Sequence, residues 1–213
     1  MIRFPTRCSM TLAAMLALAA CGGEPAPADA DTSASADPVE EPASSVTDEG
    51  AAPESRDPAP DGRFSSRYTD LDLDDCELVS QQTEGEGSTW RCPGLGDMAL
   101  IVMSGDGRMD LDAGADNGAW ESIGAFNAEP DTVEWRMADG VPLAIIYRLR
   151  DVTPQGNGKT VLMVETVGND GCLVGRVAGD TANANARART IADEAADGFA
   201  CGADEPETVG EAT

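Results

Sequence analysis

The segment from Gly22 to about Asp61 most strongly limits where this chain can fold. It is dominated by Ala, Pro, Asp, Glu and Ser, and it contains no aromatic residue and no Leu, Ile or Met. Such a segment cannot bury enough apolar surface to offset the entropy lost on ordering. We therefore expect residues 21–61 to form a disordered acidic Ala/Pro tether, and folding to be confined to the residues that follow.

The first twenty residues predict an export signal. Arg3 and Arg7 are not balanced by any acid, and the apolar run Thr11–Ala20 follows them. That run fits the apolar part of a signal peptide and is too short to cross about 30 Å of hydrocarbon. We expect residues 1–20 to be a signal peptide.

The end of the apolar run resembles the lipobox of bacterial lipoproteins. The residues that carry the resemblance are Leu18-Ala19-Ala20-Cys21, followed by Gly22. The resemblance implies a lipoprotein whose Cys21 is the lipid attachment site and whose partner is the membrane. In this class an Asp after the cysteine usually signals retention at the inner membrane, so Gly22 implies the outer membrane. A soluble secreted protein that is cut nearby is the alternative.

Charge and composition exclude several classes of function. The chain has 39 acidic and 14 basic side chains, a formal net charge of -25. Nucleic-acid binding by phosphate neutralisation is therefore excluded. The absence of histidine excludes Ser-His-Asp and Cys-His catalysis as well as histidine-ligated metals.

Four cysteines remain in the exported domain, which we place at residues 62–203. An even number of cysteines in an exported chain predicts disulfides. Four cysteines allow three pairings, and we favour Cys76–Cys92 with Cys172–Cys201 because each pair is local and lies at one end of the domain. The last ten residues, 204–213, repeat the acidic composition of the tether and are expected to form a disordered acidic tail.

Alternating apolar residues and glycine-containing turns predict paired strands. Three hairpins are expected, each with a turn between its strands, and a shorter strand is expected near Ser88–Cys92, ended by Pro93 and Gly94. The three hairpins cover residues 98–113, 132–149 and 160–178.

Farther along, the apolar period changes to that of a helix. Ala184, Ala188, Ile191, Ala195 and Phe199 recur at helical spacing, with Asp180 or Thr181 as the N-cap. A helical turn could also form at residues 74–79. The fold class expected is α+β: a mostly antiparallel β-sheet of hairpins with a C-terminal α-helix packed on one face.

Three stretches together resemble small exported proteobacterial proteins of unknown function. They are residues 68–76, residues 90–96 and the segment from Ile191 to Gly202. The resemblance covers the domain and not the tether. It implies no catalytic residues, so it supports the domain and no mechanism.

Acidic residues at alternating positions suggest calcium, but the spacing does not fit an EF-hand. Counted from Asp110, the third and twelfth positions are Asp112 and Glu121, whereas the fifth and sixth are Gly114 and Ala115. An EF-hand loop needs an oxygen ligand at the fifth position and glycine at the sixth. A loop counted from Asp70 fails as well, so we predict no metal and no cofactor.

The sequence contains no nucleophile elbow, phosphate loop or dinucleotide fingerprint. We therefore expect no enzyme, but a non-catalytic, lipid-anchored cell-envelope protein that binds an envelope protein or peptidoglycan. The candidate binding surface comprises Trp120, Arg136 and Arg148, because an exposed ring beside arginines could stack on a sugar or meet an acidic peptide. The simpler interpretation is that such rings fill the core while the arginines cover a solvated face. The alternative function is an acidic periplasmic inhibitor of a basic protein such as a lysozyme.

Overall fold

The computed structural model describes residues 62–82 and 87–212, all within one compact unit of the chain. The predicted signal peptide, Cys21 and the tether lie outside the described residues. Within the described part, no helix is both long and apolar enough to cross a membrane.

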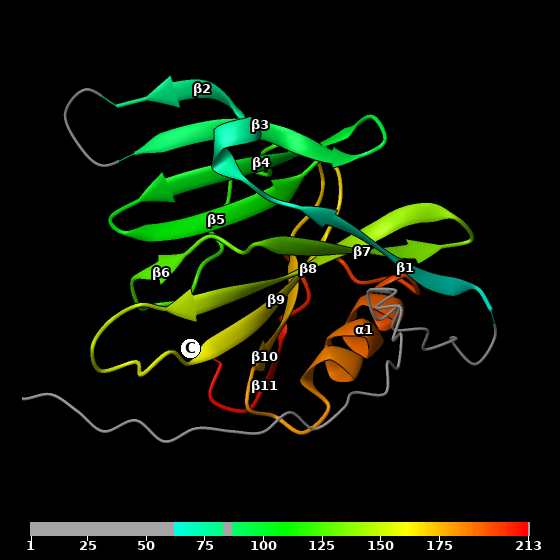
Figure 1. Ribbon diagram of the computed structural model, residues 1–213. Coiled ribbons are helices and arrows are strands. Elements are labelled where there is room, and N and C mark those ends of the chain that lie inside the picture. Colours follow the sequence, from blue (N-terminus) through cyan, green and yellow to red (C-terminus); the bar gives the residue numbers. More distant parts are fainter. Residues whose placement is uncertain (1–61, 83–86, 213) are drawn as a thin grey trace, which may run out of the picture. The chain divides into compact units, whose positions relative to one another are not determined.

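The larger sheet has seven strands and is antiparallel except at one edge. Its strands run in the order β1-β7-β8-β9-β10-β11, and the short strand β6 also pairs with β8 (Figure 1). β10 and β11 are parallel. The strands are β1 (Phe64–Asp70), β6 (Asn127–Ala128), β7 (Thr132–Ala138), β8 (Val141–Asp151), β9 (Thr160–Thr166), β10 (Leu173–Ala178) and β11 (Glu207–Val209).

The smaller sheet is a four-stranded antiparallel meander in the order β2-β3-β4-β5. A 3-10 turn, η1 (Leu73–Asp75), leads into it from β1. Its strands are β2 (Glu77–Gln81), β3 (Ser88–Leu95), β4 (Met98–Gly105) and β5 (Arg108–Ala113).

Two apolar clusters produce three layers. One cluster lies between the two sheets and contains Trp135 and Tyr147 of the larger sheet together with Leu100 and Leu111 of the smaller sheet. The other lies between the opposite face of the larger sheet and α1 (Ala184–Ala195). Both clusters follow from period-two alternation, since successive strand residues point to opposite faces.

The predicted fold class is confirmed: the described chain is mostly antiparallel β-sheet with one C-terminal helix, and it has two disulfides. The three hairpins form where the turn residues indicated. Asp106 and Gly107 turn one hairpin and Asp139 and Gly140 turn another, all with positive φ, the geometry that tight hairpins require. The sequence did not predict that the strands divide between two sheets.

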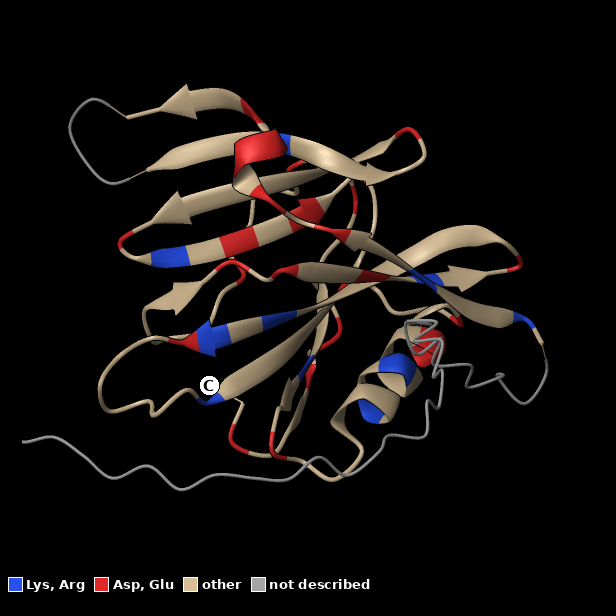
Figure 2. Cartoon of the chain, viewed as in Figure 1, with Lys and Arg blue, Asp and Glu red and all other residues tan. Residues whose placement is uncertain are grey.

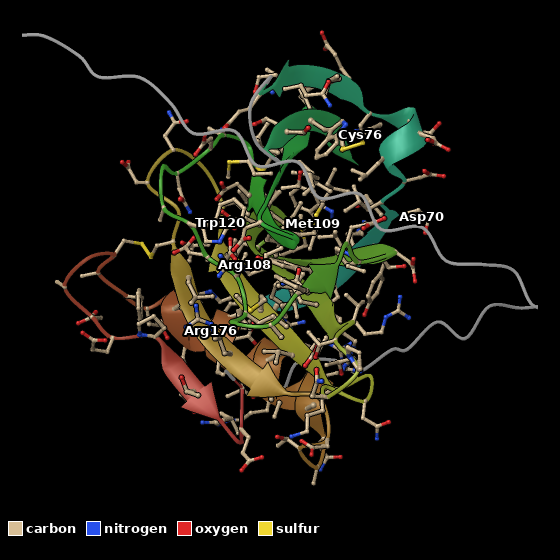
Figure 3. The ribbon with its side chains drawn as sticks, turned by 90° about the vertical axis from the view of Figure 1, so that its left-hand side faces the viewer. Asp70, Cys76, Arg108, Met109, Trp120 and Arg176 are labelled. Atoms are coloured by element: carbon tan, nitrogen blue, oxygen red, sulfur yellow. A yellow bond between two sulfur atoms is a disulfide. The ribbon has the colours of Figure 1, made fainter. Side chains whose placement is uncertain are left out.

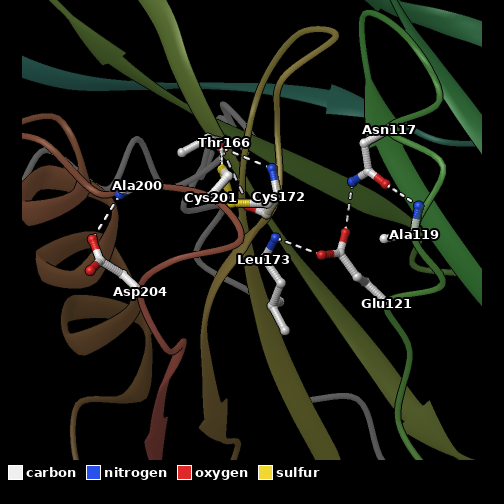
Figure 4. Close-up of a disulfide and its surroundings, with 9 residues drawn as sticks. All are labelled: Asn117, Ala119, Glu121, Thr166, Cys172, Leu173, Ala200, Cys201 and Asp204. Atoms are coloured by element: carbon white, nitrogen blue, oxygen red, sulfur yellow. Dashed lines mark hydrogen bonds between the residues drawn. A yellow bond between two sulfur atoms is a disulfide. The ribbon is translucent and has the colours of Figure 1, made fainter.

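The two disulfides join Cys76 to Cys92 and Cys172 to Cys201, as favoured from the sequence. The first bridge connects the end of η1 to β3. The second connects the start of β10 to the segment that follows α1, as Figure 4 shows. Each bridge thus attaches a short or irregular segment to a strand.

Several predicted boundaries are wrong for local physical reasons. β3 continues through Pro93 to Leu95, because the pairing register shifts between Cys92 and Leu95 and no ladder hydrogen bond is needed from proline there. The turn predicted at residues 74–79 is confined to η1 and is followed by β2. α1 begins later than predicted, with Asn183 at the N-cap in a left-handed conformation and no side-chain cap.

The predicted disordered tail is also wrong for residues 204–212. Within this segment β11 pairs with β10, and Ala212 is buried in the core between the sheets. The composition of these residues suggested a tail. Their backbone N–H and C=O groups nevertheless pair with the open edge of β10, and such pairing uses no side chain.

Candidate functional site

A cluster of carboxylates lies where the edge strand of the smaller sheet meets the larger sheet. Asp110 and Asp112 come from β5, Glu165 comes from β9, and Glu121 comes from the segment between β5 and β6. Asp110, Asp112 and Glu165 are at most 4% exposed. We call these four residues the acidic cluster. Acidic bands are visible along β5 in Figure 2.

Three members of the acidic cluster converge on one point. One carboxylate oxygen from each of Asp112, Glu121 and Glu165 lies within 4.8 Å of the oxygens from the other two. Such a group of oxygens could hold a cation, which is the chemistry that this geometry allows most directly.

Residues 114–126 between β5 and β6 form a segment that we call the covering loop, and Glu121 holds it against the larger sheet. Its Oε1 accepts a hydrogen bond from the Leu173 amide at 2.8 Å, and its Oε2 accepts one from Asn117 Nδ2 at 2.7 Å (Figure 4). The backbone N–H of Asn117 in turn donates to Asp112 Oδ2 at 3.3 Å. The loop between β5 and β6 is thereby connected to both sheets.

Glu165 is bonded on one side only. The Tyr147 hydroxyl donates to its Oε1, whereas its buried Oε2 has no hydrogen-bond partner among the described residues. Asp110 is similar, because its Oδ1 accepts from the Leu111 amide at 2.9 Å while no described residue donates to its buried Oδ2. Buried polar atoms are rarely left unbonded, so these two oxygens require an explanation.

Burial and mutual repulsion raise the pKa values of the cluster. The pKa of Asp110 is raised to about 7, mainly by burial and then by the charge of Asp112. The pKa of Asp112 is also raised to about 7, mainly by burial, with a smaller contribution from the charge of Glu121. Burial raises the pKa of Glu165 well above its usual value, and the hydrogen bond from Tyr147 only partly opposes this.

The largest charge effects on these three carboxyl groups come from other acids, and they raise the pKa values. Near neutral pH the cluster therefore either retains protons or gains a cation, since several uncompensated charges cannot share a buried site.

A half-exposed surface with two aromatic rings is formed by the covering loop and by Val152, which follows β8. Trp120, Phe126 and Val152 are 45%, 53% and 52% exposed, and we call them the aromatic surface. Figure 3 labels Trp120 in the middle of the view, next to Arg108 and Met109.

Two glycines at the β4–β5 turn leave room for the aromatic rings of this surface. A Cβ on Gly105 would come within 3.4 Å of the Trp120 ring, and a Cβ on Gly107 would come within 3.1 Å of the Phe126 ring. A side chain at either glycine would therefore crowd a ring, and Gly107 also needs its positive φ.

The arginines of the predicted binding surface do not join Trp120. Arg136 is only 4% exposed and forms a two-bonded ion pair with Asp193 of α1, at 2.6 and 2.7 Å. Arg148 bonds Thr160 and Asn185, the latter also on α1. The structure therefore separates these two residues from Trp120, which faces the β4–β5 turn. The expectation that such arginines cover a solvated face is wrong for Arg136, because α1 covers that face.

An acidic groove lies between α1 and the segment that follows it. Its volume is about 500 Å³, and its apolar lining includes Val174, Ile191 and Phe199. Asp197, Asp204 and Glu207 on its rim bond other groups of the protein, whereas Glu194 and Glu205 are exposed without a side-chain partner among the described residues.

Sequence reasoning identified part of this site and missed the rest. It singled out Asp110, Asp112 and Glu121 but discarded them on EF-hand spacing, and it did not mention Glu165. The sequence does contain a signal for Glu165. This residue lies two and four positions after Met163 and Val161 on the same strand, so it points to the same face, and these two residues face the core between the sheets. An acid at an inward-facing strand position indicates a buried polar site.

Comparisons with protein-family models, with curated proteins and with solved structures found no match for this chain.

Proposed function

We propose that this chain is an exported, lipid-anchored, non-catalytic protein of the cell envelope, attached through Cys21, whose folded domain binds another envelope component. The lipobox-like sequence supports the anchor and its place in the outer membrane. The disulfides fit an oxidising compartment. The sequence resemblance to small exported proteins of unknown function agrees with this class.

The observation that carries the binding role is the aromatic surface. Large exposed apolar side chains clustered at one place often mark an interaction site. Flat ring faces suit stacking on sugars, and the acidity of the chain disfavours an anionic partner. We therefore propose peptidoglycan glycan strands as the ligand of this surface, and we treat an envelope protein as the other outcome of the test.

Site-specific photocrosslinking in cells tests this role. A photoreactive phenylalanine analogue would replace Trp120 in the full-length protein. The matched control carries the analogue at Val141, an apolar side chain that is 64% exposed on β8. We expect an adduct at position 120 that muramidase digestion releases, with none at position 141. A discrete protein adduct at position 120 would replace peptidoglycan by an envelope protein, and equal labelling at both positions would contradict a binding role for the surface.

The anchor is tested separately. We expect Cys21→Ser to abolish incorporation of labelled palmitate and to move the protein from the membrane fraction to the soluble fraction. Unchanged membrane association would contradict lipid attachment at this residue.

The acidic groove favours a second candidate function, an inhibitor of a basic protein such as a lysozyme. An apolar floor with an acidic rim is complementary to a basic segment that carries apolar side chains. We expect inhibition of lysozyme at low salt that weakens as salt rises, and that is reduced by Glu194→Gln with Glu205→Gln. The matched control is Asp70→Asn with Asp74→Asn, outside the groove. No inhibition by the wild-type protein would contradict this candidate.

A further inference from the structure

We propose that Asp112, Glu121 and Glu165 bind a calcium ion that links the smaller sheet to the larger one. This inference concerns the inside of the domain and does not depend on the proposed function. It rests on the convergence of three carboxylates and on the buried Glu165 oxygen that has no hydrogen-bond partner among the described residues.

The geometry of the three carboxylates suits calcium. Calcium–oxygen distances are about 2.3–2.6 Å, so two oxygens bound to the same ion lie at most about 5.2 Å apart. The three oxygens here lie within 4.8 Å of one another. Magnesium requires a stricter octahedral arrangement and usually keeps several waters, whereas calcium accepts a flexible set of carboxylate oxygens.

The buried oxygens provide the second observation. Glu165 is 1% exposed and supplies one of the three converging carboxylates, and among the described residues its Oε2 has no hydrogen-bond partner. Asp110, also 1% exposed, precedes Asp112 by two positions on the same strand, and its Oδ2 likewise has no hydrogen-bond partner in the described part of the chain. A bound cation would satisfy the buried carboxylate of Glu165.

The donor set also selects the class of ion. All the converging atoms are carboxylate oxygens, which prefer hard cations. The chain has no histidine, and the four described cysteines that could offer a thiolate are in disulfides. Zinc and copper, which prefer nitrogen and sulfur ligands, therefore lack their usual partners at this site.

The ligands come from three separate parts of the fold, and the apolar core and the hydrogen bonds of Glu121 already bring these parts together. Asp112 is on the edge strand of the smaller sheet, Glu165 is on β9 of the larger sheet, and Glu121 is in the covering loop. A bound ion would connect all three. It would also order the loop that carries Trp120, the neighbour of Glu121, so calcium would couple the core to the aromatic surface.

Calcium titration of the full-length protein, purified in detergent and stripped with EDTA, tests the proposal. Calorimetric titration is expected to show one site that Asp112→Asn and Glu165→Gln each remove. With calcium at 100-fold excess over its Kd, Tm is expected to rise by about 5–10 °C. The matched control Glu129→Gln, an exposed acid outside the acidic cluster, should retain both effects.

Three outcomes would overturn the proposal. The first is the absence of calorimetric binding by the wild-type protein, with an unchanged Tm in 1 mM calcium. The second is an equal response to magnesium and calcium, which would contradict the choice of ion. The third is calcium binding that persists in both variants, which would place the ion elsewhere on this acidic chain. The wild-type titration decides the first two even if a variant fails to fold.

Discussion

At the scale of single residues, the carboxyl groups of β5 are in an environment that opposes their charge. Asp110 is buried, accepts a hydrogen bond from the Leu111 backbone amide, and faces other acids. Its pKa is raised to about 7 as a result. A raised pKa means that the folded protein binds a proton that the unfolded chain releases at the same pH. The contribution of this group is therefore fully present below pH 3.8 and is lost as the pH rises through about 7.

The metal-free protein should consequently lose stability relative to Asp110→Asn as the pH rises from about 4 to about 7. The asparagine does not titrate, so the difference in the free energy of unfolding should change by on the order of 3 kcal/mol. Urea unfolding in EDTA at pH 4.5 and pH 7.5 measures it. Parallel pH dependence of the two proteins would show that Asp110 has an ordinary pKa.

At the scale of elements, polar contacts as well as apolar ones hold α1 on the larger sheet. Ile191, Ala188 and Ala192 provide its buried face. Beside them, Arg136 of β7 pairs with Asp193, and Arg189 of the helix pairs with Glu134 of β7 at 2.7 Å. Both bridges are largely shielded from water, so removing one partner leaves a charge without compensation.

Asp193→Ala should therefore lower the free energy of unfolding by about 3–5 kcal/mol, since it leaves the Arg136 guanidinium buried and unpaired. The matched control is Asp197→Ala, which removes the exposed acid next to α1 that bonds Arg63 and should change stability by less than about 1 kcal/mol. Urea denaturation followed by circular dichroism compares the two. Similar effects for both substitutions would mean that the Arg136 pair contributes no more than a surface pair.

The second disulfide acts at the same scale, because it fastens the segment after α1 to β10. Replacing Cys172 and Cys201 by serine should reduce the free energy of unfolding by about 3–4 kcal/mol, the value expected for a loop of 29 residues. Thermal unfolding without reductant checks this. Hydrogen exchange should show the largest loss of protection at the C-terminal segment, and uniform loss would contradict a local role.

At the scale of the whole domain, one apolar core joins the two sheets. Trp135 lies at its centre, fully buried, and its indole N–H donates to Thr69 Oγ1 at 2.9 Å. The same core includes Leu100 and Leu111 of the smaller sheet. Both sheets contribute side chains to this core. If one sheet unfolded, the apolar side chains of the other would be exposed to water.

We therefore expect both sheets to unfold in one cooperative transition. Trp135→Ala should destabilise both together by about 3–5 kcal/mol. Denaturation monitored by hydrogen exchange at β4 and at β8 would give coincident midpoints. Separate midpoints would show that the sheets are independent folding units.

Local patterns predicted most elements of the fold but only part of the candidate site. The Asp106–Gly107 and Asp139–Gly140 turns, the strand alternation and the helical spacing around Ile191 are properties of neighbouring residues, and all three predictions were confirmed. Glu165 and Glu121 are 44 positions apart in the sequence, and only the meeting of β9 with the covering loop brings them together. An EF-hand test could not detect such a site, since it requires all ligands in one short loop.

The sequence by itself predicted the pairing of strands into hairpins, the favoured pairing of the four cysteines and the α+β class, and the structure confirms all three. These depend on local composition, turn chemistry and period, which act within a few residues along the chain. Only the tertiary structure decided that the hairpins divide between two sheets, that Arg136 is covered by α1, that residues 207–209 complete a sheet edge and that the acids converge. Those outcomes depend on which apolar faces pack together and on the burial that follows, and burial is a property of the assembled molecule.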